Sequence, residues 1–162
     1  MKISILYHSE SGNTKKIARI ISEGARSAGN IEALAMSIDE IDETFLNASD
    51  AVIFGCPTYL GTFTWQMKKF LDTSRIRLSG KLGAVFVTAR YIGGGGDVAE
   101  LGLVGHLLVK GMLVYSGGGG EGKPFTHFGA VAIEDGDGPQ RERAHIFGER
   151  IARKAIELFS GE

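Results

Sequence analysis

The sequence predicts an α/β fold, a three-layer sandwich in which a five-stranded parallel sheet lies between two layers of helices. Three observations predict it. Short apolar segments suited to buried parallel strands alternate with segments of helical spacing along the 162 residues. A polar turn joins the first strand to the first helix. Three loops of unusual composition fall at the carboxyl ends of strands, where such sheets bind ligands. We expect a single domain, 1–162.

The first half of the chain supplies three of the strands. They are expected at Lys2–Tyr7, at Ile31–Ile38 and at Ala51–Gly55, where Pro57 ends the third. Between the first two, apolar residues recur at helical spacing over 17–28, with charged residues on the opposite face. This order of strand, helix and strand is the repeating unit of a parallel sheet.

The middle of the chain continues the alternation. Thr64–Asp72 is expected to form a short helix, with Trp65, Phe70 and Leu71 facing the core. Leu82–Ala89 is the clearest strand of the sequence, because it is apolar throughout and rich in residues that favour strands.

The last part of the chain supplies two further helices and the sheet edge. Asp97 is expected to cap a helix that Gly111 ends. Met112–Tyr115 is the next strand, and Ala130–Ile133 is a candidate continuation of that edge strand. Pro139 opens the final helix, because proline suits the first helical turn.

Composition excludes several classes of protein. The net charge of −1 provides no basic surface for nucleic acid. Cys56 is the only cysteine, so an internal disulfide is impossible and a reducing compartment, the cytoplasm, is expected. The apolar run Ile3–Tyr7 is too short for a signal peptide or a membrane span. No cluster has the spacing of metal ligands.

The segment after the first strand has the composition of a phosphate-binding turn. Free N–H groups and the helix dipole stabilise phosphate at a helix N-terminus. Hydroxyl side chains add donors and a glycine lets the backbone curl, while the absence of a lysine suits a phosphate monoester better than a triphosphate. An ordinary capped helix is the alternative. The predicted phosphate-binding residues are Ser9, Glu10, Ser11, Gly12, Asn13 and Thr14.

This turn resembles the phosphate loop of the flavodoxin family, which binds the 5′-phosphate of FMN. Pro57–Gly61, Lys81–Gly83 and the loop Gly93–Gly96 are similar to the NAD(P)H:quinone oxidoreductase branch, which contains the tryptophan-repressor-binding-protein-like flavoproteins. The resemblance implies the strand order 2-1-3-4-5 and two loops that flank the isoalloxazine ring. It adds to the cofactor site Pro57, Thr58, Tyr59, Leu60, Gly61, Thr88, Ala89, Arg90, Tyr91, Gly93 and Gly94.

Aromatic side chains in these loops suit a planar ring. Tyr59 and Tyr91 lie beside glycines and are expected to contact it. Phe63 and Trp65 fit a core position as well as a ring contact. Arg90 departs from the family pattern, where small or hydroxyl residues are usual. Two roles are equally consistent with an arginine at this position: a cation beside flavin N1, and an exposed side chain without contact to the ring.

Other candidate side chains carry weaker signals. His127, in the glycine-rich loop Gly117–Phe128, is a candidate to hydrogen-bond a quinone or a nicotinamide, and a solvated histidine on a mobile loop is the alternative. His8 is expected to be partly buried and bonded to backbone. Cys56 is expected to be a small core residue rather than a redox thiol.

The resemblance predicts an FMN-dependent oxidoreductase that passes electrons from NAD(P)H to a quinone or a similar small acceptor, and suggests a homo-oligomer. The alternative is a flavodoxin-type electron carrier whose partners are redox proteins. Carriers of that family are usually strongly acidic, so the charge of −1 argues against this alternative. A flavin-binding sensor is a third hypothesis. A dinucleotide-binding domain is disfavoured, because the G-x-G-x-x-G match at Gly117–Gly122 precedes Lys-Pro rather than a helix.

Overall fold

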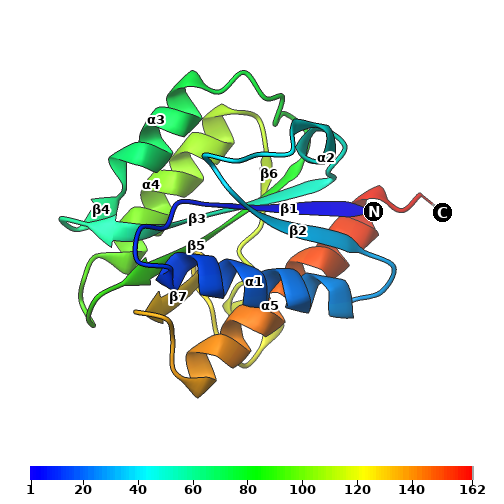
Figure 1. Cartoon of the computed structure of the whole chain (residues 1–162). Helices are drawn as coiled ribbons and strands as arrows, with labels where there is room; N and C mark the ends of the chain where they lie inside the picture. The colour runs from blue at the N-terminus through cyan, green and yellow to red at the C-terminus, as the bar shows by residue number, and fades with distance from the viewer. Residues whose placement is uncertain (162) are drawn as a thin grey trace.

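The computed structural model describes residues 1–161, in which seven strands form a sheet with helices on both faces (Figure 1). The strand order is β2-β1-β3-β5-β6, with β4 antiparallel to β3 and β7 parallel to β5. The elements are β1 Lys2–Tyr7, α1 Asn13–Ser27, β2 Glu32–Ser37, α2 Glu43–Asn47, β3 Ala51–Tyr59, β4 Thr62–Phe63, α3 Trp65–Thr73, β5 Leu82–Ala89, α4 Gly96–Val109, β6 Leu113–Val114, the 3₁₀ turn Gly119–Glu121, β7 Ala130–Ile133 and α5 Gly138–Phe159.

Two short strands share the edge position beside β5. β6 pairs with the first residues of β5, Leu82 and Gly83, and β7 pairs with its last four, from Phe86 to Ala89. Both run parallel to β5. With β6 and β7 counted as one interrupted strand and the β4 hairpin set aside, the predicted order 2-1-3-4-5 is confirmed. The segment between them leaves the sheet and returns to it.

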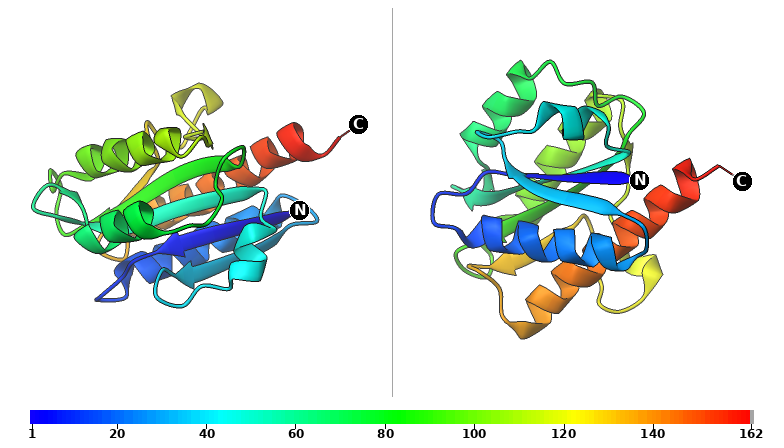
Figure 2. Two further views of the ribbon diagram at one scale, coloured as in Figure 1. Left: turned by 90° about the horizontal axis from the view of Figure 1, so that it is seen from above. Right: turned by 45° about the vertical axis from the view of Figure 1, so that its right-hand side comes forward.

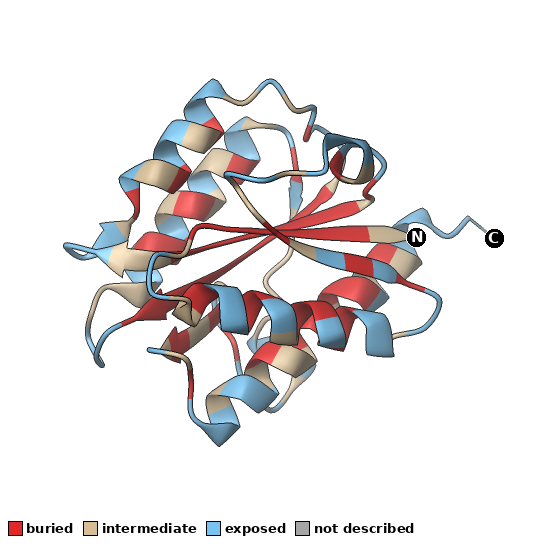
Figure 3. Ribbon diagram, viewed as in Figure 1, coloured by how far each residue is buried: buried red, intermediate tan, exposed pale blue. Residues whose placement is uncertain are grey.

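Each face of the sheet carries its own hydrophobic core. α1 and α5 cover one face, while α2, α3 and α4 cover the other, as Figure 2 shows. The central strands are buried almost throughout (Figure 3), because both of their faces lie under helices. α1 and α5 touch backbone to backbone, since a Cβ at Gly148 would lie 2.1 Å from the carbonyl oxygen of Ile21.

The third strand is longer than predicted. Pro57 was expected to end it, but β3 continues to Tyr59. The physical reason is that the pairing with β1 stops at Gly55. Beyond that point β3 is an edge strand on its β1 side, where proline is tolerated. The extension carries the chain out past the sheet to the β3–β4 hairpin.

Two helix starts also differ from the prediction. Trp65 was expected in the core, but it is the first residue of α3 and 65% exposed, while Met67 and Leu71 provide the buried contacts. Asp97 was expected as the cap of α4. It lies inside the first turn instead, and Gly95 holds the capping position with φ of 87°. None of the helices within residues 1–161 is long and apolar enough to cross a membrane.

Candidate functional site

The three loops singled out in the sequence meet at the carboxyl edge of the sheet and enclose a hollow of about 540 Å³. Every lining residue except Glu134 belongs to the predicted set. Ser9 and Gly12 lie in the same turn as the lining residues of the first loop. The lining residues are Glu10, Ser11, Asn13, Thr14, Pro57, Thr58, Tyr59, Thr88, Ala89, Arg90 and Glu134.

The first loop is a braced turn at the N-terminus of α1. The Ser9 hydroxyl accepts hydrogen bonds from the N–H groups of Gly12 at 3.2 Å and Lys15 at 3.3 Å. Gly12 caps the helix with φ of 91° and has no side chain to cover the helix end. The N–H groups of Asn13 and Thr14 therefore lack acceptors in a preceding turn. This arrangement suits an anion at the helix end.

Two buried hydroxyls tie the first loop to the third. Thr14 Oγ1 lies 2.8 Å from Thr88 Oγ1, and both residues are buried. Thr14 is in the first turn of α1, while Thr88 is the second-last residue of β5. The bond fixes the helix N-terminus against the end of a central strand, so the two sides of the hollow keep a constant separation.

The Glu10 carboxylate points to the second loop. It accepts a hydrogen bond from Gln66 Nε2 at 2.9 Å, and its other neighbours are Tyr59 and His8. Burial raises the pKa of the Tyr59 hydroxyl, and the hydrogen bond to Glu10 adds to the increase. Glu10 is thus engaged with the wall of the hollow, which leaves the helix end free for an anion.

His8 departs from the expected pattern. The sequence predicted a bond to backbone, but neither ring nitrogen has a hydrogen-bond partner among residues 1–161. The side chain is buried, and Nε2 lies 3.6 Å from Glu10 Oε1. The ring fills the space between the end of β1 and the Glu10 carboxylate.

The second loop is a tight hairpin that packs against the third loop. Leu60 and Gly61 have φ of 49° and 80°, as a two-residue type I′ turn requires. A Cβ at Gly95 would lie 2.6 Å from the Cα of Gly61, so only glycine fits there. The hairpin and the third loop therefore pack closely and form one wall of the hollow. Leu60 at the tip is fully exposed.

The third loop extends beyond the main hollow. Tyr91, Gly93 and Gly94 line a smaller adjoining hollow of about 350 Å³. The Gly94 N–H donates to the Tyr91 carbonyl at 3.1 Å and closes the turn. The Tyr91 ring and the Arg90 side chain are exposed. Both side chains thus stand at the rim.

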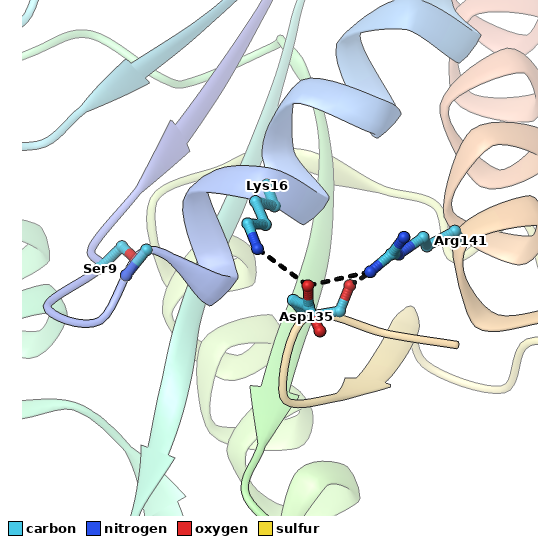
Figure 4. A network of polar contacts seen from close by, with 5 residues as sticks. Ser9, Lys16, Asp135 and Arg141 are labelled. Carbon is cyan, nitrogen blue, oxygen red and sulfur yellow. Dashed lines mark hydrogen bonds and ion pairs between the residues drawn. The ribbon is translucent and has the colours of Figure 1, made fainter. Parts of the chain in front are cut away.

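The fourth side of the hollow was missed from the sequence. Glu134 follows β7, has φ of 53°, and donates its N–H to the Ala89 carbonyl at 2.7 Å. The next residue, Asp135, pairs with Lys16 and Arg141, each at 2.9 Å (Figure 4). The pair with Lys16 ties the β7–α5 turn to α1, and the pair with Arg141 ties it to α5. The position of Glu134 directly after an apolar strand was the signal in the sequence that could have placed it at this edge of the sheet.

The glycine-rich loop Gly117–Phe128 lies outside this site. None of its residues lines either hollow. Arg150 of α5 donates hydrogen bonds of 2.9 to 3.2 Å to five of its carbonyl groups, those of Gly117, Glu121, Gly122, Lys123 and Pro124. The structure thus holds this loop against α5, and it does not bring His127 to the hollow.

Cys56 is a core residue, as predicted. Its side chain is fully buried in β3. Burial raises the pKa of the thiol to about 11, although hydrogen bonding with Thr64 lowers it. The thiolate that redox chemistry requires is therefore disfavoured at neutral pH.

Comparison with known proteins gives one consistent family. The sequence pattern of the flavodoxin domain matches residues 4–91. A flavodoxin of Clostridium saccharobutylicum is 51% identical over 160 residues, which cover 98% of this chain and 100% of that protein. An NAD(P)H dehydrogenase (quinone) of Archaeoglobus fulgidus is 29% identical, over 97% of this chain and 98% of its own.

Solved structures agree on the fold. The flavodoxin, WrbA-like protein from Agrobacterium tumefaciens superimposes with a TM-score of 0.79 at 26% identity, over 96% of this chain and 98% of that one. A flavodoxin from the domain Archaea gives a TM-score of 0.77 at 24% identity, over 96% and 99% of the two chains.

Proposed function

This chain belongs to the flavodoxin family, and we propose that it binds FMN and carries electrons between redox partner proteins. The observation that carries the proposal is the 51% identity to a flavodoxin over the whole of that protein. A second flavodoxin, from Aquifex aeolicus, is 34% identical over 93% of this chain. Function is more often retained at this similarity than at the 29% identity of the quinone dehydrogenases.

The chemistry of the hollow fits FMN. The N-terminus of α1, with free N–H groups and the hydroxyls of Ser11 and Thr14, suits a phosphate monoester. The volume of about 540 Å³ lies within the usual range for sites of small ligands. Tyr59 and Tyr91 provide aromatic surface on the second and third loops for a planar ring.

In this proposal the protein's part is to hold the cofactor and tune its environment. Bound FMN supplies the redox chemistry. Ser11, Asn13 and Thr14 would hold the phosphate, and the backbone around Thr58 and Ala89 would hold the ring end. Glu10 and Glu134 place two carboxylates around the hollow, while Arg90 places one guanidinium. Carboxylates near the ring would disfavour the addition of an electron.

The second candidate is NAD(P)H-dependent reduction of a quinone. The WrbA-like structure and the distant quinone dehydrogenases favour it. The length of the alignment argues against this candidate. The alignment with the Archaeoglobus fulgidus quinone dehydrogenase has 195 positions and this chain has 162 residues, so at least 33 positions of that enzyme, 195 minus 162, have no counterpart here. The carrier is therefore the better supported of the two.

The test begins with the purified full-length chain and FMN. We expect FMN fluorescence to be quenched at a one-to-one ratio, and riboflavin, which lacks the phosphate, to bind at least ~100-fold more weakly. Thr14→Val should weaken FMN binding, while Thr73→Val, a matched change of an exposed threonine on α3, should not. Equal affinity for riboflavin and FMN would contradict the phosphate assignment.

A second measurement separates the two candidates. The FMN-loaded protein is mixed with NADPH or NADH and a soluble quinone. An electron carrier should give no turnover, yet should exchange electrons with a reduced redox protein. Rapid nicotinamide oxidation that depends on the quinone would instead establish the enzyme and overturn the carrier proposal.

A further inference from the structure

Helix α4 exposes apolar side chains on the side that faces away from the sheet. Most surface helices present polar residues there. In α4 the residues at this side are Val98, Leu101, Gly105, Leu108 and Val109, and all five are exposed. Val109 is 90% exposed and Leu101 is 49% exposed. We refer to these five residues as the α4 stripe.

The α4 stripe borders a groove. Helices α3 and α4 are drawn in Figure 1. The groove lies between them, has a volume of about 540 Å³, and is lined by Leu71, Gly102 and Gly105 among others. At Gly105 a Cβ would meet no atom within 4 Å, so the helix has an open gap at that point. Leu101, one turn earlier, projects beside this gap.

This pattern is complementary to itself when two copies of α4 run antiparallel. With a two-fold axis at the level of Leu103, Leu101 of one copy faces the gap at Gly105 of the other, and the reverse contact follows by symmetry. Val98 then faces Leu108. The absence of a side chain at Gly105 also allows the two helices to approach closely.

The charges at the helix ends match in the same arrangement. Asp97 lies in the first turn of α4 and Lys110 follows its last residue. Antiparallel packing brings the Asp97 end of each helix to the Lys110 end of the other. It also places the positive end of each helix dipole near the negative end of its neighbour. A parallel arrangement would bring like charges together.

From these observations we propose that the α4 stripe is the interface of a two-fold symmetric homodimer, its occupant being a second copy of this chain. The stripe spans 12 residues, from Val98 to Val109, or roughly 18 Å of helix. An interface of this length lies at the lower end of specific interfaces, so we expect a dissociation constant on the order of micromolar. None of the stripe residues lines the main hollow, so that hollow stays accessible in the dimer, while Val98 also lines the smaller adjoining hollow.

The experiment measures the mass of the full-length chain in solution over a range of concentrations, by analytical ultracentrifugation. We expect a monomer–dimer equilibrium for the wild type. Leu101→Glu should weaken dimerisation at least ~30-fold, because it puts a charge at the centre of the interface. Leu158→Glu is the matched control, since Leu158 is a helical leucine on α5 with 47% exposure. It should change the dissociation constant less than ~2-fold.

A charge exchange tests the orientation. Asp97→Lys should weaken the dimer, and adding Lys110→Asp should restore it. A wild-type protein that stays monomeric at millimolar concentration would overturn the proposal, as would a dimer that Leu101→Glu leaves intact. Titration of the two leucine variants with FMN provides an independent measurement. Because Leu101 and Leu158 line neither the main hollow nor the adjoining one, the FMN affinity of Leu101→Glu and Leu158→Glu should be unchanged, whether or not the dimer forms.

Discussion

Thr14 and Thr88, 74 residues apart in the sequence, meet hydroxyl to hydroxyl at 2.8 Å at the base of the hollow. One comes from the start of α1 and the other from the end of β5. Their hydrogen bond joins the turn proposed to hold the phosphate to the loop proposed to hold the ring. When the two ends of a site already lie at the separation that the ligand requires, less binding free energy is lost in ordering them.

Removal of this bond should weaken FMN binding. Thr88→Val leaves the Thr14 hydroxyl buried without its partner, which costs about 1–3 kcal/mol. Because this cost reduces the binding free energy, we expect the dissociation constant of FMN to rise at least ~5-fold. Fluorescence titration measures it. Thr88→Ser keeps the hydroxyl and should retain most of the affinity. An equally large loss in Thr88→Ser would show that packing, and not the bond, is responsible.

Stability should depend on pH through Glu100. This residue of α4 is buried, its Oε1 has no hydrogen-bond partner among residues 1–161, and burial raises its pKa from 4.5 to about 8, with the nearby Asp97 adding to the shift. Below pH 4.5 both the folded and the unfolded state hold the proton. As the pH rises toward 8, the unfolded state ionises first, so the free energy of unfolding falls, and it levels off above that pH.

The variant Glu100→Gln should lose this pH dependence. At pH 9 it should be more stable than the wild type by ~2 kcal/mol or more, because the wild type must then bury a charge. Urea unfolding at pH 5, 7 and 9 measures the difference. Glu142→Gln, an exposed glutamate on α5, is the matched control and should follow the wild type. Parallel pH profiles for wild type and Glu100→Gln would contradict the assignment.

Arg150 should hold the glycine-rich loop without affecting the hollow. Arg150→Ala removes five hydrogen bonds to backbone carbonyls, and the free energy of unfolding should fall by about 1–3 kcal/mol. The loop should become a preferred site of limited proteolysis. Arg153→Ala, on the same helix, removes an exposed pair with Glu149 and should change stability by less than ~0.5 kcal/mol. Altered FMN affinity in Arg150→Ala would show that this loop reaches the site.

Arg90 should raise the reduction potential of bound FMN. Arg90 lines the hollow with its side chain exposed at the rim, and a cation near the ring stabilises the negative charge that reduction adds. Arg90→Ala should therefore shift the midpoint potential to a lower value. Arg75→Ala, an arginine remote from the hollow, should leave the potential unchanged. A redox titration with the same midpoint for wild type and Arg90→Ala would exclude this role.

Local patterns allowed most of the fold and the three loops to be predicted. The turn Ser9–Thr14 lies between an obvious strand and an obvious helix, so its position at the sheet edge follows from chain order alone. The interrupted edge strand was also expected from two separated apolar segments. These features depend on neighbours in sequence, so a single sequence was sufficient to predict them.

The features that were missed depend on neighbours in space. Pro57 looks like the end of a strand, and only the early end of the pairing with β1 explains why β3 continues. Glu134 carries no motif, and it reaches the hollow because β7 returns to the sheet beside Ala89. Trp65 looks apolar enough for the core, yet Met67 and Leu71 occupy the buried face of α3.

The choice between carrier and enzyme could not be made from the loops. The turn Ser9–Thr14 resembles the flavodoxin family as a whole, so its presence does not distinguish the two. The expectation of an enzyme rested on the similarity of Pro57–Gly61, Lys81–Gly83 and Gly93–Gly96 to the quinone oxidoreductase branch, and the net charge of −1 was taken as evidence against a carrier. The 51% identity to a flavodoxin favours the carrier instead.

The break between β6 and β7 makes the sheet edge a suitable place for engineering. The segment between these two strands leaves the sheet after Val114 and returns to it at Ala130. It is held against α5 by the hydrogen bonds of Arg150 and by Lys154, which lies over the Tyr115 ring. A Cβ at Gly120 would meet no atom within 4 Å, and Gly120 lines neither hollow, so a foreign peptide or a fluorescent reporter inserted there would find open space outside the site. The protein could thus serve as a scaffold that presents added sequence while its cofactor site stays intact.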